Sequence, residues 1–105
     1  MDERDFFIPL RKIDAAIRVR YQKEHGQVFR FLVQLEAYLD ETWTPVSRYD
    51  NAHGFIHRDD LRPDSTELKS PPMTFDNNQA AVEYAIEDFR LNCRFYIERY
   101  RQWIH

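Results

Sequence analysis

Apolar and polar residues alternate along two stretches in the first half of the chain. In residues 13–22 and 28–39 every odd-numbered position is apolar or aromatic, and many even-numbered positions carry arginine, glutamine or an acid. A period of two in β-branched and aromatic residues is typical of strands with one buried face. We therefore predict two half-buried strands at these positions.

The segment between these strands predicts a hairpin. In a hairpin, the residue numbers of any two paired positions add up to the same total. Both apolar sets have odd numbers, so they lie on one face only if this total is even. An even total requires a loop with an odd number of residues. Glu24–Gly26 supplies a three-residue loop, with glycine at the position that favours a left-handed backbone. This register pairs Tyr21 with Phe29, Val19 with Phe31, and Ile17 with Val33.

Weaker patterns flank this hairpin. A third strand is expected at 43–50, where Pro45 favours an edge position or a bulge. Residues 54–58 indicate a short, irregular fourth strand, and the proline-rich segment 59–75 predicts a loop. Residues 6–10 are apolar and contain a proline that excludes a helix, so they form a short strand or an arm on the core.

A long helix is the clearest element. Apolar residues near the C-terminus recur in steps of four and three, which defines one stripe of a helix. The stripe consists of Val82, Ile86, Phe89, Cys93, Tyr96, Tyr100 and Trp103. Asp76, with Gln79 three positions later, resembles a capping box. We predict a helix over 77–104, about 40 Å long at 1.5 Å per residue.

These elements predict one α+β domain over residues 1–105. Its architecture is an antiparallel meander of three or four strands packed against one long C-terminal helix. The strand at 28–39 also carries Val28, Leu32 and Tyr38 on its other side. A second apolar face beside a long helix predicts a homodimer.

Composition narrows the class of protein. The 105 residues are 43% hydrophobic and 31% charged, with a formal net charge of -3. No apolar run is long enough to span a membrane, and the acidic start is unlike a leader, so we expect a cytoplasmic protein without a membrane partner. One cysteine excludes an internal disulfide, and mild acidity argues against a nonspecific nucleic-acid coat. We expect no cofactor.

A polar stretch, RYDNAHGFIHRDD, spans residues 48–60 and begins in the last residues of the third strand. It holds two of the four histidines, three acids and two arginines, and its groups crowd without helical spacing. One of the two glycines of the chain, Gly54, lies between His53 and His57. A bend at this glycine is needed if the two imidazoles are to share one site.

Three interpretations of this stretch remain open. In the first, His53 and His57 are the general base and acid of phosphodiester chemistry, because imidazole titrates near neutral pH. Arg48 or Arg58 then binds the phosphate, and Asp50 fixes a histidine tautomer.

The second interpretation is a small metal-binding domain, in which His53 and His57 bind a metal together with Asp50 or Asp59. The third is structural. Turn residues and surface ion pairs then explain the polar stretch, and the protein is a non-catalytic, oligomeric interaction module.

The stretch also carries a family resemblance. The motif Arg-Tyr-Asp-x-Ala-His-Gly-Phe-x-His-Arg-Asp begins at Arg48 and is followed by a proline-rich loop and a helix with an Asp-Phe pair at 88–89. It resembles small uncharacterised prokaryotic proteins that are in turn similar to TumE-type toxins of toxin–antitoxin systems. The resemblance highlights Tyr49, Asp50, Asn51, His57 and Arg58.

The resemblance implies a cytoplasmic toxin-like protein that acts on RNA and has a small antitoxin as its partner. Asp59 stands where the family has its second histidine, so a two-histidine mechanism here requires His53. The expected catalytic residues are His53, His57, Asp50 and Arg58, and the expected substrate-binding residues are Arg48, Tyr49 and Asn51.

Overall fold

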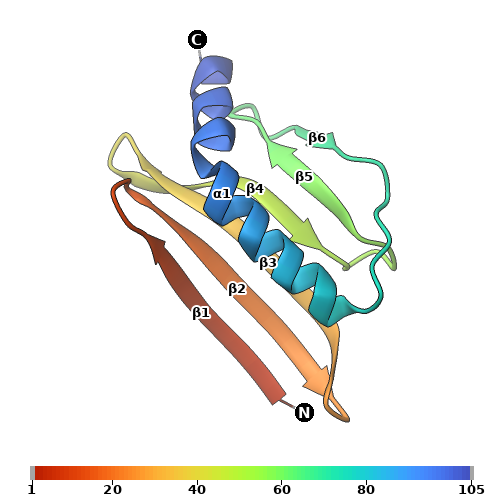
Figure 1. Cartoon of the computed structure of the whole chain (residues 1–105). Coiled ribbons are helices and arrows are strands. Elements are labelled where there is room, and N and C mark those ends of the chain that lie inside the picture. The colour runs from red at the N-terminus through yellow and green to blue at the C-terminus, as the bar shows by residue number, and fades with distance from the viewer. Residues whose placement is uncertain (1, 105) are drawn as a thin grey trace.

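Six antiparallel strands form one sheet in chain order, and a single helix crosses one of its faces (Figure 1). The computed structural model describes residues 2–104. The elements are β1 (Asp2–Leu10), β2 (Ala15–Glu24), β3 (Gln27–Leu39), β4 (Thr42–Asp50), β5 (His57–Leu61), β6 (Glu67–Lys69) and α1 (Asn78–Ile104). The α+β class and the long C-terminal helix are confirmed, whereas the expected three or four strands are too few.

The additional strands lie where the apolar pattern is weak. The whole of 2–10 pairs with β2, and not only its apolar part. The predicted loop at 59–75 contains most of β5 and all of β6, and the expected strand at 54–58 begins only at His57. All three residues of β6 are exposed. A strand without a buried face has no alternation to reveal it, so its backbone pairing with β5 alone defines it.

The β2–β3 hairpin has a shorter loop than predicted. His25 and Gly26 form a two-residue turn with φ of 54° and 75°, as the right-handed twist of a hairpin favours. A two-residue turn alone would pair odd-numbered with even-numbered residues. A bulge at Gln22/Lys23 shifts the pairing by one residue, so that odd-numbered residues again lie opposite odd-numbered ones. The apolar sets share a face as expected, but the predicted register is wrong by two residues. The observed pairs are Tyr21 with Phe31, Val19 with Val33, and Ile17 with Leu35.

The core lies between α1 and the face of the sheet that carries the odd-numbered apolar residues. Ile17, Val33 and Leu35 of the sheet and Phe89 of the helix are fully buried. The predicted stripe of α1 faces this layer, and Cys93 is a buried free thiol within it. Burial of the apolar faces of β2, β3, β4 and α1 is therefore the main source of stability.

The start and the interior of α1 both differ from the helix that the apolar stripe predicts. Asn77 caps the helix, since its Oδ1 accepts a 2.8 Å bond from the Ala80 backbone N–H, and the expected Asp76 box is wrong. Gln79 donates instead to Glu83. The helix is kinked at Asn92, where φ is -116° and ψ is 15°. Beyond the kink, α1 rises toward the loop between β5 and β6 (Figure 1).

The other face of the sheet is not covered by any described element (Figure 1); we call it the open face. Val28 was expected there, but the β2–β3 bulge reverses the alternation and Val28 joins the core. Leu32 is half-buried and Tyr38 is exposed. The homodimer stays a prediction. Within residues 2–104, no helix is long and apolar enough to span a membrane.

The layer between helix and sheet generates the first prediction. Phe89→Ala should lower the free energy of unfolding by about 3–5 kcal/mol, because it leaves a cavity in the core. Leu91, on the same helix, is 67% exposed, so Leu91→Ala is a matched control that should change stability by less than about 0.5 kcal/mol. Urea denaturation measures both variants, and equal losses would contradict this packing.

Candidate functional site

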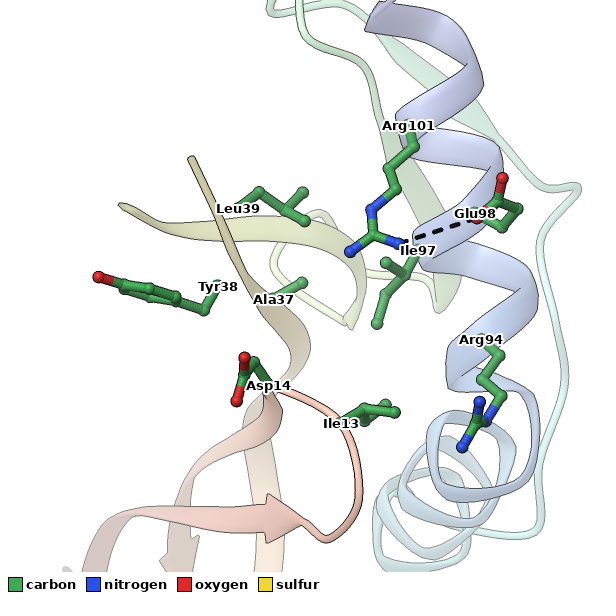
Figure 2. Close-up of a pocket in the computed structure, with 9 residues that line it drawn as sticks. All are labelled: Ile13, Asp14, Ala37, Tyr38, Leu39, Arg94, Ile97, Glu98 and Arg101. Carbon is green, nitrogen blue, oxygen red and sulfur yellow. Dashed lines mark ion pairs between the residues drawn. The ribbon is translucent and has the colours of Figure 1, made fainter. Parts of the chain in front are cut away.

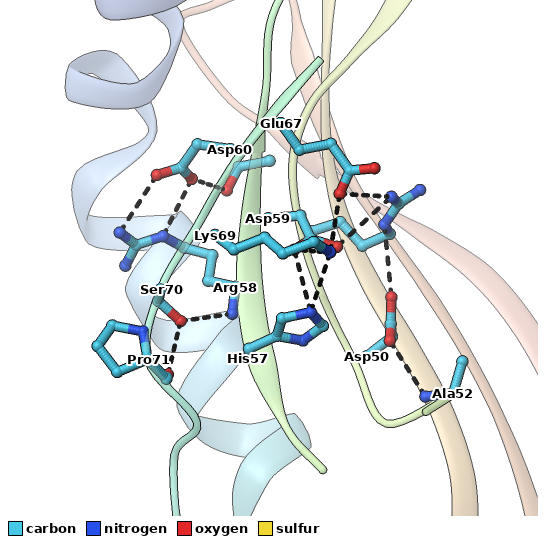
Figure 3. Close-up of polar contacts among 12 residues, drawn as sticks. Asp50, Ala52, His57, Arg58, Asp59, Asp60, Glu67, Lys69, Ser70 and Pro71 are labelled. Atoms are coloured by element: carbon cyan, nitrogen blue, oxygen red, sulfur yellow. Dashed lines mark hydrogen bonds and ion pairs between the residues drawn. The ribbon is translucent and has the colours of Figure 1, made fainter. Parts of the chain in front are cut away.

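Strand alternation divides the predicted site between the two faces of the sheet. Successive side chains of a strand point to opposite faces. In Figure 3, His57, Asp59 and Asp50 point away from the helix, whereas Arg58 and Asp60 point toward it. Residues that are adjacent in the sequence therefore belong to two different environments.

The open face carries a charged group that we call the His57 cluster. Its members are Arg48, Asp50, His57, Asp59, Glu67 and Lys69, which come from β4, β5 and β6. The Lys69 ammonium lies 3.2 Å from both Asp59 Oδ1 and Glu67 Oε2, and 3.3 Å from His57 Nε2. Asp59 Oδ1 is itself 3.2 Å from His57 Nε2. One carboxylate oxygen thus joins the imidazole to the ammonium.

Two cations in the cluster face three acids. The Arg48 guanidinium lies 3.4 Å from Asp50, 3.6 Å from Asp59 and 4.0 Å from Glu67. Hydrogen bonds to Asp59 and Glu67 raise the pKa of Lys69, whose side chain is 55% exposed. Lys69 therefore stays an exposed ammonium at neutral pH, and it is suited to bind an anion rather than to release a proton.

His57 is the buried centre of this cluster. Although it lies on the open face, it is only 4% exposed, and the ring of Phe55 packs against it in a tilted arrangement with a centroid distance of 5.2 Å. Asp59 Oδ1 and the Lys69 ammonium both lie beside Nε2, whereas the other ring nitrogen, Nδ1, is buried and has no hydrogen-bond partner among the described residues. An imidazole that is held beside a carboxylate and has one ring nitrogen without a partner can exchange a proton with a substrate, as a general base does.

The helix side of β5 holds a different polar group. The buried carboxylate of Asp60 accepts hydrogen bonds from Ser47 at 2.6 Å and from Arg58 at 3.0 Å, and it forms an ion pair with Arg99. The Arg58 guanidinium lies 5.2 Å from the centre of the Tyr96 ring. These contacts attach the second half of α1 to β5. Arg58, expected to be catalytic, is therefore part of the helix–sheet interface.

Tyr49 also lies under the helix. It is 1% exposed, and its hydroxyl donates a 2.7 Å hydrogen bond to Asp88 Oδ2. Tyr96 donates to the same oxygen at 2.7 Å. Burial, together with the bond to Asp88, raises the pKa of both tyrosines above the usual value. The expected substrate-binding role of Tyr49 is not supported by this position.

The turn between β4 and β5 holds the remaining predicted residues. The Asn51 side chain accepts from the Phe31 N–H and donates to the Phe29 carbonyl, so it pairs with the backbone of β3. Gly54 has a φ of +86° and donates to the Asn51 carbonyl. It therefore closes a turn. His53 is exposed, and no described hydrogen bond or ion pair joins it to His57.

The metal interpretation needs a set of converging ligands. Between Asp2 and Ile104, no group of three His, Cys, Asp or Glu side chains is placed to hold one metal ion.

The sequence did not reveal several members of the site. Asp59 was considered only as a metal ligand, although alternation along β5 places it beside His57 on the open face. Glu67 and Lys69 lie in the segment predicted to be a loop. Asp88 has ordinary helical spacing, and only the fold brings it to Tyr49.

A pocket with mixed apolar and charged walls lies away from these residues. A pocket of about 430 Å³ opens between the second half of α1 and the ends of β2 and β3 (Figure 2). Ile13, Ala37 and Ile97 line it, and the side chains of Arg94 and Arg101 project over it. No predicted site residue lines this pocket. A smaller hollow of about 180 Å³ lies on the open face beside Asp50.

Comparison with known proteins gives one match. The family described as Domain of unknown function (DUF7718) matches residues 1–105, which is the whole chain. No curated protein and no solved structure matches the chain.

The tyrosine pair generates a pH prediction. Because folding raises both pKa values, the stabilisation is fully present below about pH 10, the usual tyrosine pKa, and is lost as the pH rises above it. Tyr49→Phe/Tyr96→Phe should lose about 2 kcal/mol at pH 8. The difference from the wild type should shrink above pH 10. Urea denaturation across this range measures it, with Tyr84→Phe as the control. A constant difference would contradict the assignment.

Proposed function

The chain belongs to the DUF7718 family, and we propose that it is related to TumE-type toxins and acts on RNA at the His57 cluster. The proposal combines the motif that begins at Arg48 with the position of the cluster on the open face. No described element lies between this face of the sheet and an approaching polymer (Figure 1).

One observation carries the proposal. The His57–Asp59 pair lies beside two cations, Arg48 and Lys69, on a face that no described element covers. An oriented imidazole next to cations is the minimum equipment for transfer at a phosphodiester, which needs a proton acceptor and stabilisation of negative charge. Neither His53 nor Arg58 contributes to this arrangement.

The proposed reaction uses the 2′-hydroxyl of RNA. His57 accepts its proton, the 2′-oxygen bonds to phosphorus, and the bond from phosphorus to the 5′-oxygen breaks. The leaving oxygen takes a proton from water, and the hydroxide left behind takes the proton from His57, which gives a 2′,3′-cyclic phosphate, a 5′-hydroxyl and the original imidazole. Lys69 and Arg48 hold the phosphate. Phe55 packs against His57 and must move aside for the substrate to reach the imidazole.

A toxin of this type implies a protein that neutralises it. We propose a small antitoxin-like partner, and the neighbourhood of the gene tests this directly. An adjacent short reading frame for a helix-turn-helix protein supports the pairing, whereas isolated genes throughout the family contradict it.

The ion pairs favour one alternative. Each cation of the His57 cluster contacts at least two carboxylates, which is also expected of a rigid surface in a non-catalytic interaction module. In this case the open face associates with a second copy of the chain. Sedimentation at high micromolar concentration distinguishes the two, because a protein that is monomeric and cleaves RNA excludes the module.

Overexpression and RNA cleavage test the proposed function. The wild-type protein should slow bacterial growth, and His57→Gln should relieve this and lower the cleavage rate of purified protein by about 10²- to 10⁴-fold, the range for loss of a general base. Lys69→Met should also relieve the growth defect, because the variant binds the phosphate more weakly. His53→Gln is the matched control and should remain toxic.

Folding defects need a separate check, because His57 is buried. Lys69 is exposed, so Lys69→Met should unfold like the wild type, and its loss of activity then reports on the site. Full toxicity and cleavage in both the His57 and Lys69 variants would refute the site. A wild-type protein that neither slows growth nor cleaves RNA would refute the function.

A further inference from the structure

The small hollow beside Asp50 adjoins the His57 cluster on the open face. The residues that line it are Arg20, Gln22, Arg30, Leu32, Asp50 and Ala52, together with Tyr21 and Phe31. Asp50 belongs to both features, since it lies opposite His57 on β5 and opposite Leu32 on β3. The hollow therefore continues the surface of the cluster across the sheet toward β2.

Arg30 differs from the other arginines of this surface because no acid in residues 2–104 neutralises it. Arg18 and Arg20 both pair with Asp5, and Arg48 contacts three acids. Arg30 is exposed, lies opposite Gln22, and pairs with no acid among the described residues. Its positive charge is therefore available to an anion from outside the chain.

Strand register gives the spacing between the two features. His57, Asp50, Leu32 and Arg20 occupy one row across β5, β4, β3 and β2. At about 4.8 Å per strand, β5 and β2 are about 14 Å apart. A ligand that contacts His57 and reaches the Arg20–Arg30 side of the hollow must cross several strands, which suits a chain of nucleotides.

Apolar groups indicate which form of nucleic acid fits. Leu32 contributes an apolar surface to the hollow, and the Phe55 ring that packs against His57 is 48% exposed. Bases stack on exposed aromatic rings only when they are unpaired. A duplex hides these surfaces of its bases, whereas a single strand presents them.

We propose that the hollow with Arg30 at its rim is a second phosphate-binding subsite, for a single-stranded RNA that crosses the strands of the open face from the His57 cluster. The proposal rests on the proposed function and adds the form of the substrate and its path. Binding depends on a few cations at fixed positions, in keeping with the net charge of -3.

Binding of a 2′-O-methyl octanucleotide tests the subsite, since this probe keeps the phosphates but cannot be cleaved through its 2′-oxygen. Fluorescence anisotropy should show that Arg30→Gln weakens binding about threefold to tenfold and lowers the slope of log K against log salt by about 0.7. A 2′-O-methyl dinucleotide reaches only the His57 cluster, so the wild type and Arg30→Gln should bind it equally.

The matched control is Arg90→Gln, which lies on the helix, pairs with Glu87 and should not affect binding. Equal octanucleotide affinity and salt slope in Arg30→Gln and the wild type would overturn the subsite, while RNA cleavage by the wild type would still uphold the proposed function. A duplex that binds as tightly as the single strand would overturn the single-stranded path. A wild-type protein without binding or cleavage would overturn both.

Discussion

In residues 2–104, one helix packs on the central strands of a six-stranded sheet, and this arrangement determines the chemical character of those strands. The covered face is mostly apolar and excludes water from the layer beneath α1, where Phe89 and Leu35 are fully buried. Its buried carboxylate, Asp60, is paired with Ser47, Arg58 and Arg99. The other face has no such cover in the described structure and must be compatible with water. Charged side chains can therefore gather there in fixed positions, supported by a rigid sheet.

The parts of the fold that depend on buried apolar faces were predictable from the sequence. The helix over 78–104 and the strands at 15–24, 27–39 and 42–50 all have such faces. Periodicity did not reveal β6, because its backbone bonds alone place it in the sheet. Nor did it reveal the bulge at Gln22/Lys23, which depends on the geometry of the two-residue His25–Gly26 turn.

The candidate site was predicted as one continuous segment of the chain, whereas in the structure it is a surface to which several strands contribute. Alternation along β4 and β5 separates Asp50 and His57 from Tyr49 and Arg58, and the latter two serve the helix–sheet interface. The partners of His57 come from positions far along the chain, such as Lys69. Proximity in sequence identified the strands that carry the site. Only strand pairing identified the side chains that share it.

The order of the strands has a consequence for folding. Each strand pairs with its neighbour in the chain, so the sheet can form through successive local hairpins, and such local contacts favour rapid folding. The helix closes the longest loops, since Asn78 bonds to the carbonyl of Val28 fifty positions earlier. During synthesis the sheet can therefore assemble while its apolar face is still bare. Until α1 emerges and docks, the nascent chain is at its most prone to aggregate.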